Sequence, residues 1–104
     1  MRETPAKISH TSALILKTIS AGYMYGFDVM EVTGLPSGTI YPALRRLEEE
    51  ALVRGNWEDL RHAASDRPRR KYYRLTRRGE DALAVVTRRY PLLAQLKPEE
   101  KTRR

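Results

Sequence analysis

The apolar residues of this chain change their spacing at Leu52. Before that residue they recur at the spacing of amphipathic helices. After it, apolar and polar residues alternate as far as Trp57, which is typical of a strand with one buried face. A second alternating segment covers about residues 70–76 and can pair with the first. The expected fold class is therefore mainly α with a two-stranded antiparallel hairpin (α+β).

Glycine, proline and small polar residues set the expected limits of the helices. The expected ranges are 11–21, 26–33, 36–51 and a last helix that begins after Thr76. Gly34 is expected to take a left-handed conformation that ends the second helix. Ser37 and Thr76 can each accept free N–H groups at a helix start. Pro42 lacks an N–H, so the first turn of the third helix is expected to be loose or tilted.

Each element has an expected buried side. In the second helix, Phe27 and Met30 are expected to be buried. In the hairpin, Tyr73 is expected to face inward and Tyr72 outward, while Trp57 is expected to fill the gap between the hairpin and the helices. The third helix has one narrow apolar stripe, formed by Ile40, Leu44, Leu47 and Ala51.

The positive charge of the chain is concentrated around the hairpin. The net charge is +7 over 104 residues. Residues 54–78 contain nine Lys and Arg against three Asp and Glu, whereas residues 8–53 contain three against five. A focused positive field suits a polyanion, because each neutralised phosphate releases condensed counterions. The alternative is a solvated basic loop that keeps the chain soluble.

Several classes of function are excluded by what the chain lacks. It has no cysteine, which removes disulfides, thiolate metal sites and a cysteine nucleophile. It has no nucleophile elbow, glycine-rich phosphate loop or paired-histidine motif. His10 and His62 have no acidic neighbour at ligand-like spacing. We therefore expect no enzyme activity, cofactor or metal. No apolar run approaches the length of a membrane span, so a cytoplasmic location is expected.

The expected order of elements is that of a winged helix-turn-helix. In such a module the third helix enters the major groove of DNA and the hairpin, or wing, touches the adjacent backbone or minor groove. Arg45 and Arg46 lie in the middle of the third helix and Glu48–Glu50 lie near its end, the reverse of what the helix dipole favours. This order suits a helix whose first half faces phosphate. An ordinary amphipathic helix with a random polar face is the alternative.

Two segments resemble the PadR family of transcriptional regulators. Residues 34–48 (GLPSGTIYPALRRLE) are similar to its recognition-helix signature. Residues 67–76 (RPRRKYYRLT), followed by Gly79, are similar to its wing strand and the start of its last helix. The likeness covers about residues 12–90. It departs from the family where Ala51 and Asp66 replace common glycines, and it is looser around Tyr25–Asp28.

The resemblance implies a homodimeric DNA-binding regulator, usually a repressor. Its last helix would pair with the partner subunit, and its two-fold symmetry would suit an inverted-repeat operator. The implied organisation is a DNA-binding domain at 8–76, a dimerisation helix at 77–96 and flexible ends at 1–7 and 97–104. Many relatives respond to small aromatic or cationic compounds, so such an effector is possible here. The alternative function is a winged-helix module that binds protein or RNA.

The expected order of elements and the family resemblance together indicate the candidate site residues. Ser37, Thr39, Tyr41 and Arg45 are expected in the major groove, with Arg46 on phosphate. The wing is expected to contribute Arg61, Arg67, Arg69 and Arg70. Tyr41 has a rival interpretation, in which its ring packs under the wing. The apolar residues expected at the dimer interface are Leu14, Leu83, Val86, Tyr90 and Leu93.

Overall fold

The computed structural model describes residues 8–59 and 68–89. Its elements follow in the order α1 (His10–Ser20), α2 (Gly26–Thr33), α3 (Ser37–Glu49), β1 (Val53–Trp57), β2 (Lys71–Leu75) and α4 (Arg77–Arg89). The two strands pair in an antiparallel sheet. This confirms the expected mainly α fold with a two-stranded hairpin. The predicted flexible ends lie outside the described residues.

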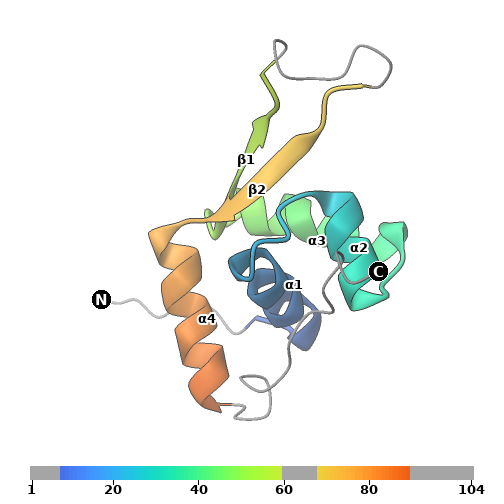
Figure 1. Cartoon of the computed structure of the whole chain (residues 1–104). Coiled ribbons are helices and arrows are strands. Elements are labelled where there is room, and N and C mark those ends of the chain that lie inside the picture. Colours follow the sequence, from blue (N-terminus) through green and yellow to red (C-terminus); the bar gives the residue numbers. More distant parts are fainter. Residues whose placement is uncertain (1–7, 60–67, 90–104) are drawn as a thin grey trace.

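Helix α1 lies at the centre of the molecule, and the hairpin projects away from the helices (Figure 1). α1 packs against α2, α3, α4 and β2. Four of its apolar residues are buried, and both Ile15 and Leu16 are fully enclosed. This explains the two apolar sides of α1, because one helix is covered by neighbours on both flanks.

The buried face of α2 differs from the expected one. Val29 is fully buried and Met30 is partly buried against the core, but Phe27 is 57% exposed. Gly26 and Val29 are the buried residues of this helix, and they lie three positions apart on one face. Phe27 follows Gly26 directly, so helical geometry turns its side chain away from that face. The prediction that Phe27 is buried was wrong.

Two expectations at the ends of α3 also need correction. Pro36 is the N-cap residue, and no side chain caps the helix, so Ser37 does not have the expected capping role. Ser37 is the first helical residue, whereas a capping hydroxyl belongs to the residue just before the helix. Ala51 is exposed and lies beyond the helix, so it does not extend the core stripe. The helix continues through Pro42.

Helix α3 ends in a turn with a left-handed residue. Ala51 has φ 63°, and the Leu52 amide donates to the Leu47 carbonyl over 2.9 Å. The Ala51 amide donates to the Glu48 carbonyl over 3.0 Å. These two bonds form a Schellman motif, which usually places glycine where Ala51 stands. The left-handed backbone at this position therefore explains why glycine is common there in the family that the chain resembles.

The same turn anchors the start of α4. The Thr76 hydroxyl donates to the Ala51 carbonyl over 2.6 Å and accepts from the Gly79 amide over 2.9 Å, which confirms Thr76 as a cap. A Cβ at Gly79 would overlap the Leu52 carbonyl. Glycine is therefore required for α4 to approach this turn, which joins α3 to the wing.

The register of the hairpin decides which aromatic rings are buried. Tyr73 lies opposite Gly55 and is buried, as expected, and its amide donates to the Met24 carbonyl over 2.9 Å. Trp57 pairs with Lys71 at the far end of β1 and is 57% exposed. The prediction that Trp57 fills the gap between the wing and the helices was wrong, because more than half of its surface stays open to solvent at the end of β1.

Candidate nucleic-acid interface

The predicted DNA-contact residues of α3 lie on the side of the helix away from the core. Ser37, Tyr41, Arg45 and Arg46 are exposed and Thr39 is half-buried. Ser37, Tyr41 and Arg45 are four residues apart, so they follow one another along the same face. The opposite face contains the four buried residues Ile40, Ala43, Leu44 and Leu47. The helix therefore presents a continuous polar row outside the core.

The described arginines of the wing are held in place but remain exposed. Arg69 donates through Nε to the Glu58 carbonyl over 2.8 Å. The Arg70 guanidinium lies 3.4 Å from the Glu58 carboxylate, and its Cζ lies 4.0 Å above the centre of the Tyr25 ring. The side chain of Arg70 is nevertheless 46% exposed. Both cations are oriented at the base of the wing loop, where a phosphate can reach them. Arg61 and Arg67 lie outside the described residues.

An ion pair joins the wing to α3. The Lys71 ammonium lies 3.1 Å from a carboxylate oxygen of Glu48. The sequence did not predict this pair, because the contact depends on how the hairpin packs on α3. Part of the acidic run at the end of α3 therefore has a structural role. The contact links β2 to α3 across Gly55 of β1, the strand that packs on α3.

A groove of about 340 Å³, called here the wing groove, lies between α2, α3 and the wing. The Tyr41 ring rests on the backbone of Gly26, where a Cβ would come within 2.6 Å of it. Tyr41 thus packs on α2 while staying 43% exposed. The residues that line the wing groove are Tyr25, Gly26, Phe27, Tyr41, Trp57, Arg69, Arg70, Lys71 and Tyr73.

The floor of the wing groove contains the buried Tyr73. Burial raises the pKa of its phenol, and Glu48 and Tyr41 act in the same direction, while Lys71 lowers the pKa in part. The phenol therefore stays protonated at neutral pH and can both donate and accept a hydrogen bond. The sequence indicated that Tyr73 faces inward, but not that it reaches this groove.

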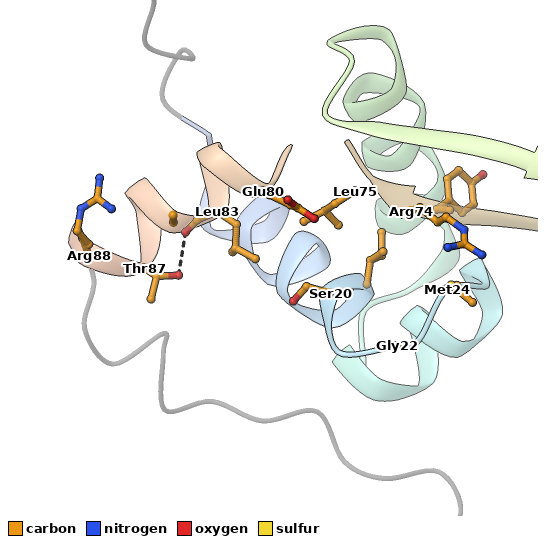
Figure 2. A pocket seen from close by; sticks show the side chains of 12 residues that line it. Ser20, Gly22, Met24, Arg74, Leu75, Glu80, Leu83, Thr87 and Arg88 are labelled. Carbon is orange, nitrogen blue, oxygen red and sulfur yellow. Dashed lines mark hydrogen bonds between the residues drawn. The ribbon is translucent and has the colours of Figure 1, made fainter. Parts of the chain in front are cut away.

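Three of the predicted dimer residues are described by the structure, and they lie on α1 and α4. Leu14 and Leu83 are half-buried, whereas Val86 is buried against Ala13 within this chain. A second groove, of about 710 Å³, runs between α1, β2 and α4 and includes Leu83 and Thr87. Figure 2 shows this groove, with the Thr87 hydroxyl donating to the Leu83 carbonyl over 2.8 Å. Tyr90 and Leu93 lie outside the described residues.

Comparison with protein families identifies the chain. The model of the "Transcriptional regulator PadR-like family" matches residues 15–85. The chain belongs to the PadR family. Members of this family are DNA-binding transcriptional regulators and not enzymes. A comparison with curated proteins gave no match.

Solved structures agree with the PadR assignment. A PadR family transcription regulator from Clostridium difficile is 25% identical, with a TM-score of 0.70 over 84% of this chain and 93% of that one. A PadR-like regulator from Bacillus cereus is 29% identical, with a TM-score of 0.64 over 81% and 84%. A Streptococcus transcriptional regulator is 28% identical, with a TM-score of 0.65 over the same shares.

The range matched by the PadR family contains every predicted DNA-contact residue, whereas Leu83 alone of the five predicted dimer residues lies within it. Across residues 8–59 and 68–89 of this PadR protein, no helix is long and apolar enough to cross a membrane. The same residues contain no group of three or more side chains suited to a metal ion.

Proposed function

We propose that this PadR-family protein is a sequence-specific repressor that binds an inverted-repeat DNA operator as a homodimer. The observation that carries the proposal is the position of two sets of residues. Tyr41, in the middle of the exposed α3 row, and the described wing arginines, Arg69 and Arg70, line the same wing groove. A duplex laid along α3 would therefore meet the wing cations beside it.

Each residue has a defined role in this proposal. The row of Ser37, Tyr41 and Arg45, with Thr39 beside it, enters the major groove, where Arg45 can donate two hydrogen bonds to a guanine edge. Arg46 binds a phosphate of the flanking strand. The wing arginines bind the backbone next to the groove and contribute affinity that does not depend on sequence. These wing residues are Arg61, Arg67, Arg69 and Arg70.

The proposed dimer forms through α1 and α4. Residues 77–96 form the dimerisation helix, and residues 8–76 form the DNA-binding domain. The half-exposed Leu14 and Leu83 and the groove between α1 and α4 support this assignment, because such apolar surface needs cover. Val86 supports it indirectly by holding α4 on α1. A two-fold dimer places its recognition helices about 34 Å apart, one turn of DNA.

Two further parts of the proposal rest on the family resemblance. A small aromatic or cationic effector releases the operator, and the protein acts in the cytoplasm, where a bacterial regulator meets its DNA. Light scattering tests the dimer directly, since a dimer has twice the chain mass of 12.0 kDa. A monomer at micromolar concentration would contradict the two-fold operator.

DNA binding is tested by fluorescence anisotropy on a palindromic duplex over a range of salt concentrations. The affinity should fall with salt with a log–log slope of several units. Arg45→Ala should reduce discrimination between bases by about 1–3 kcal/mol, whereas Arg69→Ala should weaken all sequences alike. Arg89→Ala is the charge-matched control, because Arg89 is the last residue of α4, and that end of the helix lies on the side of the molecule away from the wing (Figure 1).

Two results would contradict this proposal. Binding that is absent or insensitive to salt would favour the alternative, a winged-helix module that docks to protein or RNA. Equal effects of Arg45→Ala and Arg69→Ala on every sequence would show that Arg45 binds phosphate and does not read a base.

A further inference from the structure

Exposed aromatic rings gather in one place on this protein. The large apolar side chains that are exposed within residues 8–59 and 68–89 are Phe27, Tyr41 and Trp57. They come from α2, α3 and β1, and all three line the wing groove. Single exposed apolar side chains are common on protein surfaces. Exposed rings from three elements that meet in one groove are instead typical of a binding site.

The rim of the wing groove is cationic. Arg69, Arg70 and Lys71 line it, with Glu58 paired to Arg70 and Glu48 paired to Lys71. Lys71 also lies 5.8 Å from the centre of the Trp57 ring. Among the described residues that line the groove, three are cations and none is acidic. The groove therefore combines flat apolar walls with a positive edge.

A nucleotide has the matching chemistry. Its base is a planar π-system that stacks on aromatic side chains without regard to base identity, and its phosphate is an anion that arginine binds through paired N–H groups. A groove of about 340 Å³ lies within the usual range of small-ligand sites. We propose that the wing groove binds one nucleotide, with the base against Phe27, Tyr41 and Trp57 and the phosphate on Arg69 and Arg70.

The nucleotide can come from two sources. Duplex DNA keeps its bases stacked inside the helix, so it offers no free base face to the groove. The ligand is therefore a free mononucleotide or an unpaired nucleotide of a single strand. Arg69 and Arg70 also belong to the proposed operator surface, so a bound nucleotide competes with duplex DNA. That competition rests on the proposed function, whereas nucleotide binding itself does not.

Intrinsic fluorescence provides a direct test, because Trp57 is the single tryptophan of the chain and lines the groove. The full chain is titrated with adenosine monophosphate, with a single-stranded oligonucleotide and, as a control without a base, with ribose 5-phosphate. A stacked base should lower the emission at least twofold in a saturable way. Ribose 5-phosphate should leave the emission unchanged.

Variants of Phe27 separate stacking from charge. Phe27→Ala should weaken nucleotide affinity about tenfold, since it removes a stacking ring. Phe27→Tyr keeps the ring and should keep the affinity. Neither substitution removes a residue proposed to contact the operator, so duplex affinity should stay the same. The exposure of Phe27 makes both variants tolerable for folding.

The outcomes are distinct. Quenching by both nucleotide ligands means that a free nucleotide is sufficient, and quenching by the oligonucleotide alone means that the source is a strand. The inference is overturned if neither ligand quenches, if ribose 5-phosphate quenches equally, or if Phe27→Ala binds as well as the parent chain. Duplex binding, measured separately by anisotropy, can fail or succeed independently of these results.

Discussion

The replacement of Ala51 by glycine is expected to stabilise the protein. Ala51 has φ 63° and ends α3 in a left-handed conformation, which costs a residue with a Cβ about 1–2 kcal/mol. Glycine removes that cost but has more freedom in the unfolded chain, worth about 0.4–1 kcal/mol. Ala51 is exposed, so little packing is lost. The net expectation is a gain of about 0.5–1 kcal/mol.

This gain is measurable by urea or thermal unfolding of the full chain at one fixed protein concentration, since a dimer makes stability concentration-dependent. For a domain of this size it corresponds to a rise in Tm of about 2–6 °C. Gly34→Ala is the matched reverse change, because Gly34 has φ 77° and a Cβ added there would lie in open space. It should lower stability by a similar amount.

The reasoning would be refuted by Ala51→Gly unfolding more easily than the parent chain while Gly34→Ala stays neutral. That pair of results would show that the two left-handed caps do not control stability. Loss of the Thr76 hydrogen bond is not expected in Ala51→Gly, because Thr76 donates to the backbone carbonyl.

Two further predictions concern glycines and the buried phenol. Gly79→Ala should destabilise the fold by about 3 kcal/mol, because its Cβ would overlap the Leu52 backbone. Gly38→Ala meets open space and should raise stability by about 0.5 kcal/mol. Chemical denaturation measures both changes, and equal stabilities of the two variants would contradict the contrast. Burial raises the pKa of Tyr73 in the folded state. The stability that the protonated phenol contributes is therefore complete below about pH 10 and is lost as pH rises through the folded-state pKa. Urea midpoints measured from about pH 8 to 11 should therefore fall less steeply in Tyr73→Phe, and identical slopes would argue against burial of the phenol.

Elements with local causes could be predicted from the sequence. The bounds of α2 and the left-handed Gly34 agree with the prediction, because a helix stop at glycine depends on backbone sterics within a few residues. The antiparallel pairing of the two strands agrees as well, but the expected alternation of buried and exposed residues does not extend to Trp57 at the end of β1. The cap at Thr76 needs only its own helix start.

The candidate site was predictable in part. The exposed row of α3 follows from helical spacing, so the sequence alone places Ser37, Tyr41 and Arg45 on one face. It does not predict the aromatic part of the wing groove. Phe27 and Trp57 are apolar, and apolar residues are expected inside, so their exposure contradicts the usual rule.

The sequence by itself determined the order of the elements, the stops at glycine, the polar face of α3 and the membership of the PadR family. Only the tertiary structure decided that Lys71 pairs with Glu48, that Tyr41 rests on Gly26, and that rings from three elements share one groove. The physical reason is how far apart along the chain the interacting residues lie. Caps and periodicity depend on residues within about one helical turn, whereas exposure and ion pairing depend on residues that only folding brings together.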